Sequence, residues 1–247
     1  MAAPGYALTW DDGVFRMLGP SGESWANGVL FSDLAERAAD LDAVIARQIA
    51  FFAAHEHAFE WKLFGHDQPP QLADPLRAAG FVADDEETLV AYDVARPFAS
   101  VARPADIEFV RLDDPADFSS IADIKGDVYR DAEHAAWLVR SLQEEHQSAP
   151  DSLSVHVARS AGDVVAAAWV RFPKGSRFAS LWGGATRSDQ RRKGIYTTLV
   201  GRRLDEARER GYRWLTVDCS ADSLPILEKR GFRRLSTTTP WIWHPPR

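Results

Sequence analysis

This 247-residue sequence has a single cysteine and fewer basic than acidic residues, and each of these features argues against a class of protein. The single cysteine, Cys219, has no partner for a disulfide within the chain, and the histidines are not spaced with it as zinc ligands. No metal site is therefore expected. Lysine and arginine number 29 against 36 aspartates and glutamates, which gives a net charge of −7. Because nucleic-acid binding requires an extended basic surface, no nucleic-acid partner is expected either.

Long apolar runs are also missing. No stretch approaches the length of a membrane span, and the first residues, MAAPGYALTWDDG, lack the basic region and apolar run of an export signal. We therefore expect no membrane partner and a cytoplasmic location. The hydrophobic content of 45% is ordinary for a globular protein, and the length leaves room for two small domains or one large one.

Two common phosphate-binding motifs, G-x-x-x-x-G-K-[ST] and G-x-G-x-x-G, are absent. The sequence has instead the basic run SDQRRKGIYTTLV at 188–200, between a predicted strand and a predicted helix. Backbone N–H groups at a helix N-terminus bind phosphate, with help from the helix dipole and here from Arg191, Arg192 and Lys193. Gly194 has no Cβ to obstruct the anion. The run predicts a phosphate or pyrophosphate site; the alternative is a solvated surface loop.

The segments around this run predict regular structure. Residues 178–186 (FASLWGGAT) suit a buried strand in which Gly183 and Gly184 mark a bulge. Apolar residues at three- and four-residue spacing from Tyr196 to Ala207 predict an amphipathic helix that Gly211 ends. A strand over 212–219, a short helix over 222–230 and a turn at Gly231 follow.

Upstream residues predict the rest of one domain. Residues 106–112 alternate as a strand, and 116–128 and 133–145 are helical candidates. Two strands, 153–159 and 164–172, form a hairpin around the turn Ser160 to Asp163.

This order of elements resembles the GCN5-related N-acetyltransferase (GNAT) family. The family's pyrophosphate loop, [RQ]-x-x-G-x-[GA], is similar to Arg191 to Tyr196, except that Tyr196 replaces the small residue. A later family signature is matched by Ser223, Ile226, Lys229, Gly231 and Phe232. The resemblance covers about residues 106–247. It implies an α/β GNAT fold, with a mixed central sheet flanked by helices.

The resemblance also departs from the family pattern at two positions. Leu227 stands where the family often has a tyrosine that acts as general acid to the departing thiolate, and Ser220 stands where an asparagine is usual. Leu227 has no proton to give. A catalytically silent acyl-CoA-binding or regulatory module is therefore the competing function.

The implied activity is N-acetyl transfer from acetyl-CoA to a primary amine by direct attack, with a small molecule or peptide as acceptor. The resemblance assigns Gly184, Ala185 and Thr186 to the pantetheine arm and Ser220 to the cofactor site. The pyrophosphate residues that it implies are Arg191, Arg192, Lys193, Gly194, Ile195, Tyr196 and Thr197. The sequence does not disclose the acceptor, and it leaves a homodimer open.

Catalytic side chains are weighed against simpler roles. Asp218 is a candidate base, or else a carboxylate hydrogen-bonded to a turn. The hydroxyl of Ser223, or that of Ser220, is a candidate proton donor to the thiolate. Cys219 is read as a small buried hydrophobe and not as a nucleophile. Glu133 and His134 are candidate substrate contacts, with a solvated helix surface as the alternative. The neighbours at 55–57 (HEH) are read as a helix end and not as metal ligands.

The N-terminal part predicts a degenerate partial repeat of the same fold over 1–95, a linker over 96–105 and the acetyltransferase domain over 106–247. A long amphipathic helix from Leu34 to Phe52, a strand over 58–64, a helix over 72–79 and a strand over 88–94 repeat the C-terminal order. LADPLRAAGF is similar to DSLPILEKRGF. The expected helix start at Asn27 to Ser32 has no basic run or paired glycines, so one cofactor site per chain is expected.

Overall fold

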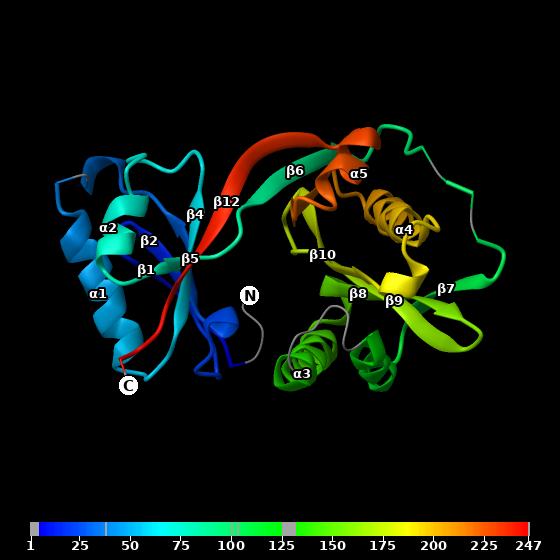
Figure 1. Ribbon diagram of the computed structural model, residues 1–247, viewed down its shortest axis with the longest axis horizontal. Helices are drawn as coiled ribbons and strands as arrows, with labels where there is room; N and C mark the ends of the chain where they lie inside the picture. The colour runs from blue at the N-terminus through cyan, green and yellow to red at the C-terminus, as the bar shows by residue number, and fades with distance from the viewer. Residues whose placement is uncertain (1–4, 38, 100, 103, 125–131, 247) are drawn as a thin grey trace. The chain divides into compact units, whose positions relative to one another are not determined.

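The computed structural model describes residues 5–37, 39–99, 101–102, 104–124 and 132–246 (Figure 1). The chain forms two compact units that are not continuous in sequence. The first unit holds the described residues of Met1–Leu89, Asp218–Ala221 and Arg234–Arg247, and the second holds those of Val90–Val217 and Asp222–Arg233. No helix in the described ranges is long and apolar enough to cross a membrane.

The sheet of the first unit has the order β1-β2-β3-β4-β12, with β5 also paired to β12. Only β3 and β4 run parallel among its pairs with a defined register. The strands are β1 (Ala7–Asp11), β2 (Val14–Leu18), β3 (Gly28–Ser32), β4 (Phe59–Phe64), β5 (Val82–Ala83) and β12 (Arg233–Trp243).

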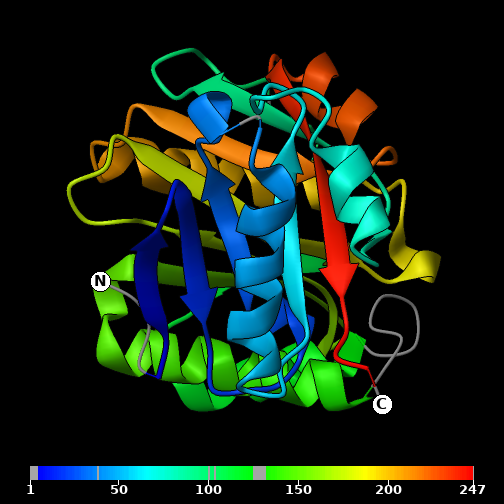
Figure 2. The same cartoon turned by 90° about the vertical axis from the view of Figure 1, so that its left-hand side faces the viewer.

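Two α-helices cover one face of this sheet. Figure 2 shows α1 (Leu41–Ala53) lying across the strands, with α2 (Ala73–Ala78) beside it. Phe52 from α1 stacks on Phe59 from β4 at 4.1 Å between ring centroids, and Trp61 is fully buried in the same core. Short 3-10 turns, η1 (Ser24–Ala26) and η2 (Ala35–Arg37), precede α1.

The sheet of the second unit has the order β6-β11-β10-β9-β8-β7. Its neighbours are antiparallel from β7 to β10, and β10 and β11 are parallel. The strands are β6 (Glu87–Asp93), β7 (Ile107–Leu112), β8 (Leu153–Ser160), β9 (Asp163–Arg171), β10 (Phe178–Thr186) and β11 (Trp214–Cys219).

Helices cover both faces of the second sheet. Figure 1 shows α3 (Ala132–Ser148) on one face and α4 (Ile195–Glu209) on the other. The core under α3 includes Leu142, Val155 and residues of η3 (Pro115–Ile124), while Ile195 and Leu199 of α4 pack against Ala166 and Ala168. The remaining short helices are η4 (Pro150–Ser152), η5 (Ser188–Gln190) and α5 (Leu224–Lys229).

Most elements predicted in the C-terminal part are confirmed. The hairpin β8–β9 turns at Ala161 (φ 50°) and Gly162 (φ 93°), the two positive φ values that a tight two-residue turn requires. The predicted helix over 116–128 is a 3-10 helix as far as Ile124, and residues 125–131 lie outside the described residues. The fold is the mixed α/β arrangement expected from the sequence.

Two predictions in the N-terminal part are wrong. The helix expected from Leu34 begins only at Leu41, because Leu34 is buried in the segment ahead of η2 and its spacing imitated a helical period. Asn27 to Ser32 is not a helix start, since Gly28–Ser32 is strand β3. Strands β1, β2 and β12 had no counterpart among the predicted elements.

Candidate functional site

The parallel pair at the centre of the second unit separates after three residue positions. The paired positions are Phe178↔Trp214, Ala179↔Leu215 and Ser180↔Thr216. Beyond Ser180, β10 continues to pair with β9 on its other side, as at Thr186↔Ala166. One edge of β10 therefore leaves its parallel neighbour before the strand reaches the basic run. A strand edge that is not paired can bind an extended ligand through its backbone groups.

A bulge on β10 depends on two glycines. The register of β10 against β9 shifts between Trp182 and Ala185. Gly183 has φ 62°, and a Cβ there would lie 1.9 Å from the Trp169 ring, so only glycine fits. The predicted bulge at Gly183 and Gly184 is confirmed.

Tyr196 is the residue at which the basic run departs from a small side chain. A Cβ added to Gly184 would meet the Tyr196 ring at 2.8 Å, which means that the ring packs over Gly184. The ring is therefore directed toward β10, where the missing Cβ of Gly184 makes room for it. The substitution is accommodated within the core of the unit.

The basic run forms a turn whose backbone is set by two left-handed residues, Arg192 (φ 64°) and Gly194 (φ 82°). Gly194 is the N-cap of α4, and no side chain caps the helix there. The first N–H groups of a helix have no intrahelical partner, so those of Ile195, Tyr196 and Thr197 point out of the helix start. Together with the positive end of the helix dipole, they suit an anion.

Four cations surround this turn, and they are exposed or half-buried. Arg187 pairs with Asp189 at 3.1 Å, Arg191 donates to the Thr186 carbonyl at 3.1 Å, and Lys193 donates to Gln190 at 2.7 Å. Arg192 is exposed beside them. Only one of these cations is held by a carboxylate in the described contacts. The turn is consequently positive overall.

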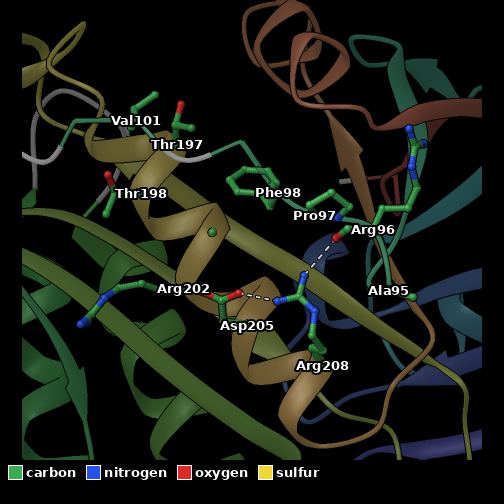
Figure 3. A pocket seen from close by; sticks show the side chains of 11 residues that line it. Ala95, Arg96, Pro97, Phe98, Val101, Thr197, Thr198, Arg202, Asp205 and Arg208 are labelled. Atoms are coloured by element: carbon green, nitrogen blue, oxygen red, sulfur yellow. Dashed lines mark hydrogen bonds and ion pairs between the residues drawn. The ribbon is translucent and has the colours of Figure 1, made fainter.

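A cavity of about 350 Å³ lies along α4, beginning at its first turn (Figure 3). Residues 95–98 and Val101 form one wall, and α4 forms the other from Thr197 to Arg208. Arg208 donates to the carbonyls of Val94 (2.7 Å) and Arg96 (3.1 Å) and pairs with Asp205. Arg208 is thereby committed to fastening the segment before β7 onto α4.

Arg203 is a fully buried cation on the sheet side of α4, with 1% exposure. It donates to the carbonyls of Leu199 (3.0 Å), Trp169 (3.0 Å) and Trp182 (3.2 Å). Burial lowers the pKa of this guanidinium to about 10, so it stays charged at neutral pH. Because Trp182 precedes the bulge, Arg203 ties the bulge to β9 and to α4.

Asp218, the candidate base, lies at the end of β11 and belongs to the first unit. Its carboxylate forms an ion pair with Lys62 of β4, and its Oδ1 atom is buried without a donor from the described residues. The sequence left a carboxylate hydrogen-bonded to a turn as the alternative role of Asp218, and the ion pair is a different contact. Its catalytic role stays a prediction.

The carboxylates that lie near Asp218 in the structure were not predicted from the sequence. Burial raises the pKa of Glu87 to about 6, with further raising effects from Asp218, Glu60 and Asp84. Burial also raises the pKa of Glu60. These residues come from β4, β6 and the segment before β6, so only the fold brings them to Asp218. The one sequence pattern that could have indicated them was the alternation of charged residues in β4.

The other candidate residues lie in several elements. Ser223 is the N-cap residue of α5, with its carbonyl accepting from Leu227, and Ser220 follows β11. Cys219 is buried and its Sγ donates to the Thr88 carbonyl at 3.1 Å, which fits a buried small side chain.

Glu133 and His134 are in the first turn of α3, on the face of the second sheet opposite α4. The structure therefore does not bring them to the basic turn. His55 follows the end of α1 at Ala53, and no group of three or more metal-ligating side chains is found within the described ranges.

Comparisons with known proteins place these features in a family. Residues 118–232 match the model of the acetyltransferase (GNAT) family, and the chain thus carries a domain of that family. No sequence relative was found among curated proteins.

Solved structures share the fold over nearly the whole chain. A GCN5-related N-acetyltransferase from Kribbella flavida is 16% identical with a TM-score of 0.73, covering 98% of this chain and 91% of its own. A tandem GNAT protein from the clavulanic acid biosynthesis pathway is 15% identical with a TM-score of 0.68, covering 100% and 85%. A GCN5-related N-acetyltransferase from Sphaerobacter thermophilus is 13% identical with a TM-score of 0.65, covering 96% and 82%. The predicted GNAT fold with an N-terminal partial repeat is confirmed.

Proposed function

We propose that the GNAT domain of this chain transfers the acetyl group of acetyl-CoA to a primary amine by direct attack of the amine on the thioester. The observation that carries the proposal is the path of β10. Its edge leaves β11 after Ser180, passes the bulge at Gly183 and ends in the positive turn that opens α4. An extended chain with a pyrophosphate at one end fits such a path.

The residues of the second unit fit coenzyme A at both of its distinctive parts. The uncapped start of α4, with Arg191, Arg192 and Lys193 beside it, would hold the pyrophosphate. The free edge of β10 at Gly184 to Thr186 would hold the pantetheine arm through backbone groups. When bound, acetyl-CoA supplies an activated acyl group on a thiolate leaving group.

The chain must also handle two protons. A protonated amine has no lone pair, so a base must take its proton, and Asp218 is the proposed base. Thiols titrate near pH 8.5, so a proton donor to the leaving thiolate helps without being essential. Ser223 or Ser220 is the proposed donor.

One observation favours the competing role as a silent acyl-CoA-binding module. Leu227 replaces the tyrosine of the family, and in α5 it is 1% exposed. Nothing at this position can donate a proton.

Two measurements on the full chain decide between these roles. Isothermal titration with coenzyme A should give one site per chain, because the segment 33–40 between β3 and α1 stands in the place of the basic turn, and it has three acidic residues and a single cation, Arg37, which pairs with Asp12. An assay for free thiol with acetyl-CoA and a panel of amines should then show thiol release that depends on the amine. Binding without release for every amine would support the silent module.

The base is tested by Asp218→Asn, which removes the charge and keeps the size. The kcat should fall about a hundredfold, with coenzyme A affinity unchanged. Asp85→Asn, an exposed aspartate of the same unit, is the matched control and should keep kcat. A normal kcat in Asp218→Asn between pH 6 and 9 would remove Asp218 from the mechanism.

A further inference from the structure

The sheet of the first unit has one face that α1 and α2 do not cover. Along β4, Phe59 and Trp61 point into the core under the helices, so Glu60, Lys62 and Phe64 alternate to the other face. Lys62 pairs there with Asp218, and its ammonium lies 5.7 Å from the Phe64 ring centroid. This face therefore carries the charged side chains of β4.

The charges on this face do not balance. The charges of Asp84 and Asp218 act on both Glu60 and Glu87, and Glu60 acts on Glu87 as well. Among the described residues, Lys62 is the cation that acts on both glutamates. We call these five residues the acidic cluster. Burial is the largest cause that raises the pKa of Glu87 to about 6, and the like charges of Asp218, Glu60 and Asp84 raise it further against the lowering effect of Lys62. At neutral pH the cluster still carries an excess of negative charge.

A second observation is that two buried polar atoms of this cluster's surroundings have no hydrogen-bond partner among the described residues. Thr238 of β12 lies opposite Phe64 in the antiparallel register, so its side chain is on the same face as Glu60 and Lys62. Thr238 is 1% exposed, and its hydroxyl has no hydrogen-bond partner among the described residues. The buried Oδ1 of Asp218 is likewise without a donor there. Buried polar atoms in native proteins nearly always find a partner.

A cation that donates hydrogen bonds would suit these atoms and the excess of negative charge, whereas a metal ion does not fit. In the part of the chain that the structure describes, no three His, Cys, Asp or Glu side chains are placed to hold one metal. An ammonium group donates up to three hydrogen bonds and needs no fixed coordination geometry. Glu60, Lys62, Glu87 and Asp218 are half-buried, so the cluster remains open to solvent.

We propose that the acidic cluster binds a polycationic amine, with ammonium groups that reach the carboxylates of Glu60, Glu87 and Asp218 and the hydroxyl of Thr238. Within the proposed acetyl transfer, which this identification rests on, the cluster selects acceptors that carry more than one positive charge. The site is carried by the first unit, the degenerate half of the fold, and not by the half with the phosphate turn.

The test compares 1,4-diaminobutane with 1-aminobutane by isothermal titration of the full chain at pH 7.5. The diamine should bind at least tenfold more tightly, and added salt should weaken its binding. Glu60→Gln and Glu87→Gln should each weaken diamine binding about tenfold. Glu86→Gln, the exposed neighbour of Glu87, is the matched control and should bind as the native chain does.

Lys62→Met should change the affinity for the diamine in the opposite direction. Removing the cation that competes for Asp218 should tighten diamine binding several-fold, which simple damage to the fold would not do. Thr238→Val, which keeps the shape of the side chain, should weaken binding a few-fold. Equal affinity for the two amines, or weaker binding in Lys62→Met, would overturn the proposal.

Coenzyme A titration of the same variants separates this inference from the proposed function. Unchanged coenzyme A affinity with lost diamine binding supports both proposals. No diamine preference in a chain that binds coenzyme A overturns the acidic cluster alone. Diamine binding in a chain that does not bind coenzyme A overturns the acetyl transfer and leaves the cation site standing.

Discussion

Two glutamates, one in each unit, respond to the fold in opposite ways. Burial alone would raise the pKa of Glu206 in α4, but hydrogen bonds from His156 (2.9 Å), Ser154 (2.7 Å) and Arg210 (2.7 Å) lower it to about 2. Glu87 in the first unit is surrounded by carboxylates, and its pKa is raised to about 6. The first carboxylate receives hydrogen bonds from three side chains, whereas the charge of Lys62 opposes burial and three neighbouring carboxylates at the second without overcoming them.

The same contrast separates the two units as binding surfaces. The second unit has an excess of cations at the start of α4, and the first has an excess of carboxylates around Lys62. The two proposed ligands, a polyanionic coenzyme A and a polycationic amine, would each bind a surface of opposite charge. Charge in a core that is fully paired, as at Glu206, contributes stability, while unpaired charge at an accessible face predicts a ligand.

Gly194→Asp has the largest expected effect. The new carboxylate lies at the helix start where the pyrophosphate is proposed to bind, so coenzyme A affinity should fall at least a hundredfold by isothermal titration. The backbone must keep φ at 82°, and the new Cβ would lie 3.2 Å from Val101, which together cost about 1–2 kcal/mol of stability. Diamine binding by the first unit should not change.

Gly194→Ala is the matched control, because it brings the same backbone strain and the same Cβ without the charge. Its coenzyme A affinity should stay within about tenfold of the native value. If Asp and Ala at this position weaken binding equally, charge at the helix start plays no part and the turn is not the pyrophosphate site.

Glu206→Gln should cost about 2 kcal/mol of the free energy of unfolding at pH 7, measured by urea denaturation. The depressed pKa of Glu206 contributes stability that is present above pH 4.5 and is lost as the pH falls toward 2. The gap between variant and native chain should therefore narrow below pH 5 and close only as the pH approaches 2. A gap that stays constant with pH would mean that the pairing with His156 and Arg210 is not the cause.

The C-terminal half of the fold could be predicted because its signals are local. The span of β10 was predicted from its small and aromatic residues, and the start of α4 from the basic run and Gly194. In the N-terminal half, β3 was mistaken for a helix start, since five residues of GVLFS have no alternation that distinguishes them. Strand β12 was missed because its partner β4 is distant in sequence.

The parts of the candidate site also differ in whether the sequence could predict them. The positive turn could be predicted because its residues are consecutive, and its role stays a prediction. The acidic cluster could not, because Glu60, Glu87 and Asp218 come from three strands and their proximity depends on the fold. Arg203 falls at the spacing of the apolar residues of α4 and is buried among them, so it is not one of the exposed cations near the basic turn. Its bonds to the carbonyls of Trp169 and Trp182 are visible only in three dimensions.

Glu87→Gln has the smallest expected effect, and its sign is opposite to that of Glu206→Gln. The folded chain holds the Glu87 proton more tightly than the unfolded chain does, because the pKa is raised from 4.5 to about 6. Ionising this carboxylate therefore costs stability as the pH rises through 4.5 to 6, and the cost is full above that window. Solvent screening of a half-buried group limits it to about 1 kcal/mol. Glu87→Gln should consequently be more stable than the native chain at pH 8 and equal to it at pH 4, by urea denaturation.

Glu86→Gln should show no such pH-dependent difference from the native chain. Saturating 1,4-diaminobutane should stabilise the native chain more than the Glu87 variant at pH 8. A Glu87→Gln chain that is less stable at pH 8 would show that the carboxylate is already paired, and the contrast with Glu206 would be lost.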